Sequence, residues 1–135
     1  MTEELHESWP AEPSAVPRAR AAVAAFARAA GATQGALDDI RLAVSEAVTN
    51  VVLHAYVGTD PGPLDVRARI RSRRLEVEVC DEGGGLRARP DSPGLGIGLP
   101  LISAVTESVQ ISSSDTERNR VVMTFNLDAV RNAIA

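Results

Sequence analysis

The chain has 135 residues, of which 14 are basic and 18 acidic, giving a formal net charge of −4. All of the basic residues are arginines. The chain therefore lacks the lysine of a phosphate-binding loop, the strand lysine of eukaryotic-type protein kinases and the amine of a Schiff-base enzyme. The acidic balance also argues against direct binding of nucleic acid.

The first half of the chain is predicted to form an edge strand and two helices. Residues 5–11 have the pattern of the strand, and Pro13 ends it. Ser14 is expected to cap a first helix that stops at Gly31. Thr33 is expected to cap a longer helix whose apolar spacing continues to a stop near Gly58. The buried face of the first helix is expected to carry Val16, Val23, Phe26 and Ala30.

The second half is predicted to be mainly strands. Residues 64–71 and 75–79 alternate apolar with charged side chains, which predicts two half-buried antiparallel strands. On their outer face arginines lie opposite glutamates, and a solvated face is favoured over a binding patch. Residues 81–98 hold six of the ten glycines, which predicts a loop. A short helix is then expected, with Pro100 in its first turn and with Leu101, Ile102 and Val105 buried.

Residues 109–112 and 121–127 complete the predicted sheet, and residues 113–120 join these two strands. Because helices and strands come in separate runs, the fold class is α+β: a two-layer sandwich with helices on one face of a mixed, mainly antiparallel sheet. A length of 135 residues suits a single domain over 1–135.

The second predicted helix carries one polar stripe. Glu46, Asn50 and His54 are spaced i, i+4, i+8, so they share one face along about 12 Å of helix. A carboxylate there can deprotonate a nucleophile, and an amide oxygen can ligate Mg²⁺. The alternative is that the stripe is only the solvated face of an amphipathic helix.

A carboxylate follows the strand at 75–79. If the apolar residues of that strand face the core, Asp81 faces the same way. An inward carboxylate needs a donor, and the exocyclic amine of adenine is one candidate. The alternative is that Asp81 accepts a hydrogen bond from the backbone of its own turn. Cys80 is expected to point to the opposite face of the strand from Asp81 and is interpreted as a packing residue.

The glycines at 94, 96 and 98 precede the last predicted helix. Glycines allow close approach of the backbone to a ligand, and free amides at a helix N-terminus attract phosphate. A dinucleotide fingerprint is excluded, because it would require glycine where Leu99 stands. A surface loop without a ligand is the alternative.

In their order along the chain, these three clusters resemble the nucleotide-binding boxes of the GHKL (Bergerat-fold) ATP-binding superfamily, over residues 12–128. The segment 45–50, Ser-Glu-Ala-Val-Thr-Asn, followed by His-Ala-Tyr at 54–56, is most similar to the anti-sigma factor serine kinases of bacterial partner-switching systems.

This resemblance implies that the chain binds ATP and Mg²⁺. It also implies that Glu46 is the general base, Asn50 the Mg²⁺ ligand and Asp81 the reader of adenine. Family members usually carry a Gly-Thr pair before the final strand, whose threonine holds adenine through water, and the matching residues here are Arg118 and Asn119. The other nucleotide contacts implied by the resemblance are His54, Gly83, Gly85, Gly94, Gly96, Ile97, Gly98, Leu99 and Asn119.

The resemblance further implies a sigma factor that the protein holds inactive, a small STAS-domain antagonist that it phosphorylates on serine, and a homodimer. Two alternatives stay open, namely a binding module without kinase activity and an orphan sensor-kinase domain. Cys80 is the only cysteine, which excludes an internal disulfide and fits a reducing, cytoplasmic location. No stretch approaches the ~18 apolar residues of a membrane span.

Overall fold

The computed structural model describes residues 4–83, 95–113 and 118–130. For residues 95–98 it describes the backbone alone. Its elements, in chain order, are β1 Glu4–Pro10, α1 Ala15–Ala29, α2 Gln34–His54, β2 Pro63–Arg71, β3 Arg74–Asp81, α3 Leu95–Val105, β4 Ser108–Ser112 and β5 Asn119–Asn126.

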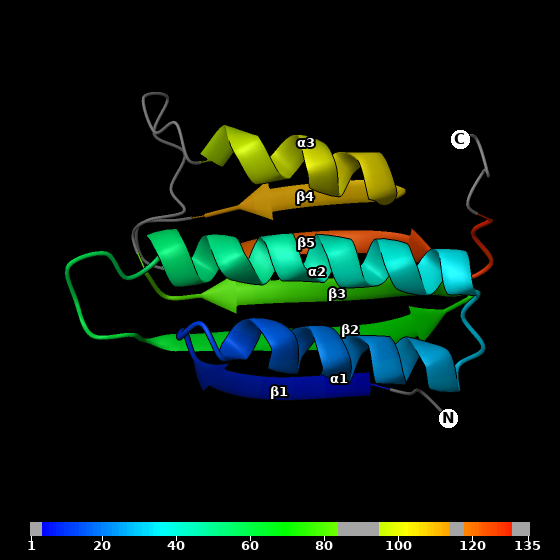
Figure 1. Cartoon of the computed structure of the whole chain (residues 1–135), viewed down its shortest axis with the longest axis horizontal. Coiled ribbons are helices and arrows are strands. Elements are labelled where there is room, and N and C mark those ends of the chain that lie inside the picture. Colours follow the sequence, from blue (N-terminus) through cyan, green and yellow to red (C-terminus); the bar gives the residue numbers. More distant parts are fainter. Residues whose placement is uncertain (1–3, 84–94, 114–117, 131–135) are drawn as a thin grey trace.

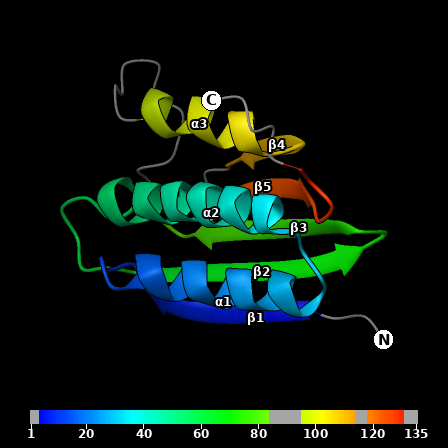
Figure 2. The ribbon, with the colours of Figure 1, turned by 45° about the vertical axis from the view of Figure 1, so that its right-hand side comes forward.

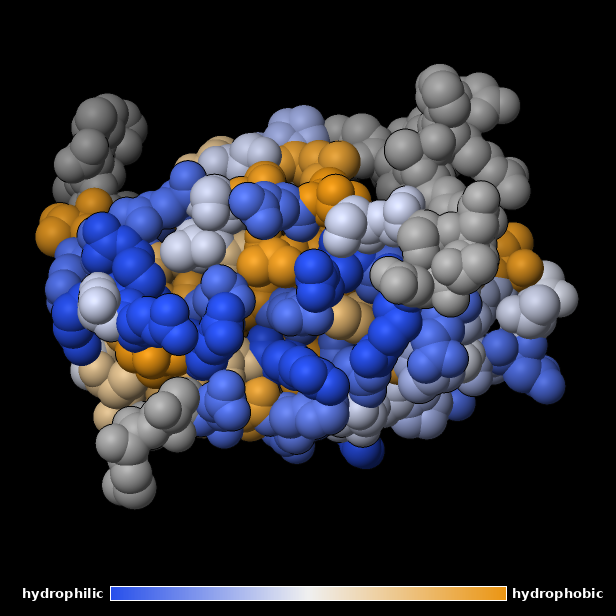
Figure 3. All heavy atoms as spheres, turned by 180° about the vertical axis from the view of Figure 1, so that it is seen from behind, coloured by the Kyte–Doolittle hydropathy of each residue, from blue (hydrophilic) through white to orange (hydrophobic). Residues whose placement is uncertain are grey.

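The strands form one five-stranded sheet in the order β1-β2-β3-β5-β4. All three helices lie on the same face of this sheet (Figures 1 and 2). The opposite face is covered mainly by hydrophilic side chains (Figure 3). The predicted α+β sandwich is therefore confirmed. Each of the four ladders is antiparallel, so the parallel pair that a mixed sheet would need is not found among the described strands.

The core lies between the sheet and the helices. On β3, Leu75, Val77 and Val79 are buried and face the helices, as the alternation predicted. The expected buried face of α1 is only partly correct, because Val23 is fully buried but Val16 and Phe26 are half-buried. The fully buried positions of α1 are mainly alanines, which let the helix lie close to the sheet while larger side chains lie at its flanks. They are Ala15, Ala19, Val23, Ala24 and Ala27.

The predicted helix caps are confirmed at Thr33 and Gly31. Thr33 Oγ1 accepts a hydrogen bond from the Ala36 N–H at 3.1 Å. Gly31 has a φ of 85° and ends α1 in the left-handed conformation that glycine favours. The side chain of Ser14 makes no capping hydrogen bond, contrary to expectation. Ser14 has a φ of −64° and a ψ of −18°, which is a helical conformation rather than the extended one that an N-cap side chain requires.

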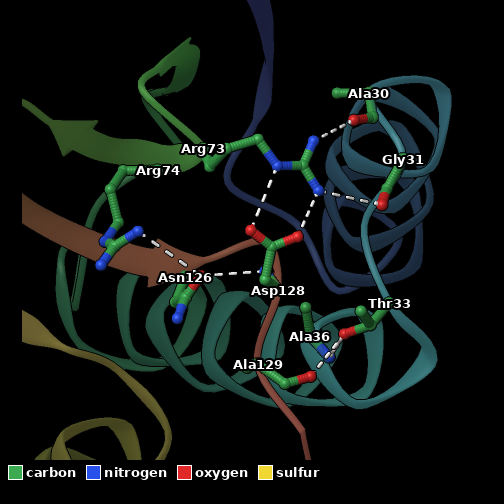
Figure 4. Close-up of polar contacts among 9 residues, drawn as sticks. All are labelled: Ala30, Gly31, Thr33, Ala36, Arg73, Arg74, Asn126, Asp128 and Ala129. Atoms are coloured by element: carbon green, nitrogen blue, oxygen red, sulfur yellow. Dashed lines mark hydrogen bonds and ion pairs between the residues drawn. The ribbon is translucent and has the colours of Figure 1, made fainter.

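A cluster around Arg73 holds one end of the molecule together (Figure 4). Arg73 lies in the tight turn between β2 and β3, and its guanidinium is bonded to Asp128 at 2.6 Å and to the carbonyl oxygen of Ala30 at 2.8 Å. The β2–β3 turn is thereby attached both to the end of α1 and to the chain that leaves β5. The other end of the sheet, where β3 ends, is where the three sequence clusters meet.

Several element boundaries differ from the sequence prediction. Helix α2 ends at His54 rather than near Gly58. Helix α3 begins at Leu95, within the segment expected to be a loop, so Pro100 lies inside the helix rather than in its first turn. A proline there removes the hydrogen bond to the carbonyl of Gly96 and its ring crowds that carbonyl, yet the helix continues to Val105. Ile102 is buried as expected, but Leu101 is 37% exposed.

Strand β5 begins at Asn119, two residues before the expected start, because the ladder between β3 and β5 extends to the pair Asp81 and Asn119.

Candidate functional site

The polar stripe predicted on the second helix lies on the C-terminal half of α2. Glu46, Asn50 and His54 are each half-buried on this helix. Helix α3 runs antiparallel to α2, and its first turn lies beside the last turns of α2 (Figures 1 and 2). The free amides at the start of α3 are therefore at the same end of the molecule as Asn50 and His54.

Asp81 ends β3 below this helix pair, and its side chain is only 1% exposed. Its Oδ1 accepts hydrogen bonds from the Gly83 N–H at 2.9 Å and from the Asn119 side-chain amide at 2.8 Å. The turn hydrogen bond considered as an alternative is thus present, but it uses only Oδ1. Oδ2 is buried and has no hydrogen-bond partner among the described residues. Burial raises the pKa of Asp81 above its usual range, and the hydrogen bonds from Asn119 and Gly83 oppose that rise.

Asn119 lies directly opposite Asp81 in the ladder and is 3% exposed. Its Nδ2 donates to Asp81 Oδ1 and also to the carbonyl oxygen of Gly83. Its own Oδ1 is buried without a partner in the described part of the chain. Leaving a buried acceptor unpaired costs about 1–3 kcal/mol, so two such oxygens on paired residues are typical of a site that a donor-bearing ligand completes. The exocyclic amine of adenine fits this requirement.

Gly83 brings the end of β3 against the end of α2. A Cβ atom at position 83 would lie 1.9 Å from the carbonyl oxygen of Ala55, which follows α2. Glycine is therefore required at position 83, because there is no room for a side chain. This contact holds Asp81 close to the end of the helix that carries Asn50 and His54.

The remaining predicted nucleotide contacts are only partly described. Gly96, Ile97 and Gly98 lie in the first turn of α3, and Leu99 is half-buried in the next turn. Gly85 and Gly94 lie outside the described residues. The helical start at Leu95 supports the role of backbone amides at this position, since the first N–H groups of a helix have no partner within it.

Tyr56 connects three segments at this end of the fold. Its hydroxyl donates to the carbonyl oxygen of Pro63 at 2.6 Å and accepts from the Glu82 N–H at 2.8 Å. Its ring lies against Gly62, where a Cβ atom would approach Cε1 to 2.4 Å. Burial raises the pKa of Tyr56 above its ordinary value, so the hydroxyl stays protonated and can donate.

This positioning role of Tyr56 was not predicted, because in the sequence Tyr56 is only the last residue of the His-Ala-Tyr motif. Its signal was that Tyr56, the only tyrosine of the chain, lies at the C-terminal end of the predicted helix, just before its expected stop near Gly58.

Arg118, for which the sequence predicted no role of its own, anchors the chain immediately before Asn119. It forms an ion pair with Asp65 on β2, and Asp65 in turn accepts a hydrogen bond from Ser8 on β1. The three side chains connect strands across the outer face of the sheet. Arg118 therefore fixes the start of β5, next to Asn119.

The described residues contain no group of three or more His, Cys, Asp or Glu side chains that could hold a metal ion. A site with a single protein ligand such as Asn50 suits Mg²⁺, which keeps several waters and binds together with phosphate oxygens. None of the helices within the described residues is long and apolar enough to cross a membrane.

Comparison with known proteins gives consistent matches. The chain matches the histidine kinase-like ATPase domain over residues 9–125. It is 32% identical over 116 residues to the anti-sigma F factor of Clostridium acetobutylicum, a match that covers 78% of this chain and 80% of that relative. It is 39% identical over 83 residues to the serine-protein kinase RsbW of Listeria monocytogenes, covering 62% of this chain and 53% of RsbW.

Among solved structures, the chain is similar to the RsbU and RsbW domains of Rv1364c from Mycobacterium tuberculosis. The TM-score is 0.73 at 23% sequence identity, and the match covers 93% of this chain and 32% of that one. This likeness supports the two-layer fold.

Proposed function

Because the chain belongs to the histidine kinase-like ATPase family, in its group of anti-sigma factor serine kinases, we propose that it transfers the γ-phosphate of ATP to a serine of a regulatory protein. The observation that carries the proposal is the pair of buried oxygens on Asp81 and Asn119 that have no hydrogen-bond partner among the described residues. They lie at the same end of the fold as the stripe formed by Glu46 and Asn50.

In this proposal the base enters between the end of β3 and the end of α2. Asp81 Oδ2 accepts a hydrogen bond from the adenine amine, and Gly83 lets the backbone approach α2 closely enough to form the pocket. The phosphates extend toward the first turn of α3, where the unpaired amides of the helix N-terminus face negative charge. Gly85, Gly94, Gly96, Ile97, Gly98 and Leu99 are proposed to line this path, with His54 beside it.

Asn50 is proposed to hold Mg²⁺ through its amide oxygen. When bound, Mg²⁺ supplies the positive charge that neutralises the phosphates, a role that the lysine-free chain cannot fill with an ammonium group. Glu46, one turn earlier on the same face, accepts the proton of the attacking serine hydroxyl. The residues of α2 thus orient the nucleophile and the phosphates for in-line transfer.

The relatives' names support a regulatory setting for this activity. We propose that the protein binds a sigma factor and holds it inactive, that a STAS-domain antagonist is the serine-bearing substrate, and that the protein acts in the cytoplasm as a homodimer. Binding of the antagonist in place of the sigma factor would then free the sigma factor.

Substitution of Glu46 by Ala tests the catalytic assignment. With radiolabelled ATP and the cognate STAS-domain protein, the Glu46→Ala variant should lose about 10²–10⁴-fold in transfer rate, while its affinity for ATP stays within a few-fold of the wild-type value. The exposed Glu12, before α1, supplies a matched Glu→Ala control. This variant should keep both the transfer rate and the affinity for ATP of the wild-type chain.

Full transfer by Glu46→Ala would overturn the role of Glu46. Absence of label with the wild-type chain would favour a module that only binds its partners. An acid-labile product would indicate transfer to histidine instead of serine.

A further inference from the structure

The solvent-exposed side of α2 is apolar. Only three residues of this helix are exposed, and two of them are leucines, Leu42 at 36% and Leu53 at 59%. Scattered exposed apolar side chains are common, whereas apolar side chains gathered on one surface mark an interaction site. Four of the six large apolar side chains that are exposed among the described residues lie on α2, in the turn after it or on the neighbouring α3. They are Leu42, Leu53, Val57 and Leu101.

The two leucines of α2 lie on one line along the helix, with Glu46 between them. Leu42 and Leu53 are 11 residues apart, which is about three turns of an α-helix. Glu46 follows Leu42 by four residues and precedes Leu53 by seven, and residues at these spacings share one face. The three side chains therefore form a ridge about 16 Å long, on the central helix of the layer that covers the sheet (Figure 1). We call it the leucine ridge.

Glu46 is the only charged residue of the leucine ridge. Between Leu42 and Leu53 the helix has no other acidic or basic residue. Thr49, which also lies on the outer side of α2, is small and half-buried. A protein that covers this stretch of α2 thus buries two leucines and has no charge to neutralise except the carboxylate of Glu46. Apolar contacts around one polar group are typical of the centre of a protein interface.

The proposed role of Glu46 indicates what covers the ridge. A general base must come within about 2.6–3.2 Å of the hydroxyl group that it deprotonates. The protein that presents the serine must therefore lie directly over Glu46. A folded protein surface placed there extends over the leucines on both sides, because they begin only one turn before Glu46 and two turns after it.

We propose that Leu42 and Leu53 are docking contacts for the serine-bearing substrate protein, and that this protein carries apolar side chains on both sides of its serine. The substrate is recognised by its folded surface rather than by the residues that adjoin the serine in sequence. The proposal rests on the proposed function, since it places the substrate over the same glutamate.

Steady-state phosphorylation of the cognate STAS-domain protein by the full chain tests the proposal. Leu42→Ala and Leu53→Ala should each raise the KM for the protein substrate about tenfold, as expected for a central interface residue. The kcat and the affinity for ATP should stay within about twofold of the wild-type values, because the lost contacts stabilise the bound substrate and the transition state equally. Ile111→Ala is the matched control. It shortens an apolar side chain that is 49% exposed on β4 and should change none of these values.

A short unfolded peptide that contains the same serine distinguishes surface docking from sequence recognition. The peptide can reach Glu46 but lacks side chains that only folding brings to the serine. Its KM should be more than about tenfold higher than that of the folded protein, and it should be the same for the wild-type chain and for Leu53→Ala. A peptide that is phosphorylated as efficiently as the folded protein would overturn the proposal.

Other occupants of the ridge give different results. If Leu53→Ala weakens ATP binding but leaves the KM for the protein substrate unchanged, the leucine belongs to the nucleotide site. If it abolishes self-association in sedimentation, or weakens only sigma-factor binding, with the same unchanged KM, a second copy or the sigma factor covers the ridge. Each of these results overturns the proposal.

Failure of the proposed function would be recognised separately. A wild-type chain that transfers no phosphate would overturn that function. Titration calorimetry of the STAS-domain protein with the wild-type chain and with Leu53→Ala would then test the docking contacts directly. Affinity about tenfold weaker for the variant is expected, and equal affinity, or no binding to either chain, would overturn the docking proposal.

Discussion

Gly83 and Ala55 are in such close contact that a methyl group at position 83 would lie 1.9 Å from the Ala55 carbonyl oxygen. Gly83 has no left-handed backbone conformation, unlike Gly31 and Gly58, so only space requires glycine here. The contact joins the end of β3 to the end of α2. It therefore connects the base-reading side of the proposed site with the side that carries Asn50.

We expect Gly83→Ala to separate these two sides. Overpacking at such a position costs about 1–3 kcal/mol of stability, and the displaced turn should weaken ATP binding about tenfold or more. Urea unfolding and titration calorimetry measure the two effects. Gly58→Asn is the control, because nothing lies within 4 Å of a Cβ at position 58 and asparagine tolerates its φ of 80°. Unchanged affinity in Gly83→Ala would show that the pocket does not depend on this contact.

Tyr56→Phe removes one oxygen that makes two hydrogen bonds, to Pro63 and from Glu82. The expected loss of stability is about 1–2 kcal/mol, or roughly 1 kcal/mol for each bond. Because Glu82 lies between Asp81 and Gly83, ATP affinity should fall several-fold as well. Thermal unfolding and nucleotide titration are the measurements.

Tyr56→Leu serves for comparison in the same experiment, because it also removes the ring that packs on Gly62. If phenylalanine is as good as tyrosine in both measurements, packing of the ring rather than the hydroxyl connects these segments.

Asp81→Asn should stabilise the free protein while weakening ATP binding. Burial raises the pKa of Asp81 in the folded state, so the folded chain binds this proton more tightly than the unfolded chain. The stability that the protonated carboxyl contributes is fully present below the unfolded-state pKa and is lost as pH rises through the folded-state pKa. The advantage of Asp81→Asn, on the order of 1 kcal/mol, should therefore grow over this pH range and level off above it.

Denaturant unfolding of both chains between pH 3 and pH 8 measures this difference. An advantage that is largest at the lowest pH would contradict the assigned direction of the pKa shift.

Periodicity was sufficient to predict the parts of this fold that depend on one repeating pattern. The 3.6-residue period located α2 and its stripe from Glu46 to His54, and the alternation on β3 predicted that Asp81 faces inward. Both are local consequences of backbone geometry, so they can be derived without knowing what packs against the element.

Features that depend on contacts between distant segments could not be predicted in this way. Glycines and Pro100 both argue against helix, yet α3 begins at Leu95, where packing beside α2 outweighs propensity. The contact of Asn119 with Gly83 joins residues 36 positions apart, and no pattern in either segment indicates it. The same holds for the hydroxyl of Tyr56, whose partners are Pro63 at the start of β2 and Glu82 directly after β3.

Cys80 should react slowly with thiol reagents in the folded chain. Its side chain is 3% exposed, and burial together with the hydrogen bond to Glu78 raises the pKa of the thiol to about 12. Because the thiolate is the reacting species, the rate at pH 8 should be lower than for an ordinary thiol by about a thousandfold. Ellman's reagent with and without denaturant measures the difference.

Glu78→Gln removes the charge beside the sulfur and should raise the reaction rate of the folded chain. Rapid reaction of the folded wild-type chain would contradict the interpretation of Cys80 as an inert packing residue.

Nucleotide binding should depend strongly on Mg²⁺, because no lysine is available to neutralise the phosphates. The proposed site has only Asn50 as a protein ligand, and the described residues contain no acidic cluster that could retain a metal ion without phosphate. Chelation with EDTA should therefore weaken ATP binding at least about tenfold, which corresponds to about 1.4 kcal/mol.

Adenosine is the control, because it has no phosphates and should bind equally with and without EDTA. Asn50→Leu should reduce the difference that Mg²⁺ makes, while leaving adenosine binding unchanged. ATP binding of equal strength in EDTA would refute the assignment of the phosphate charge to Mg²⁺ on α2.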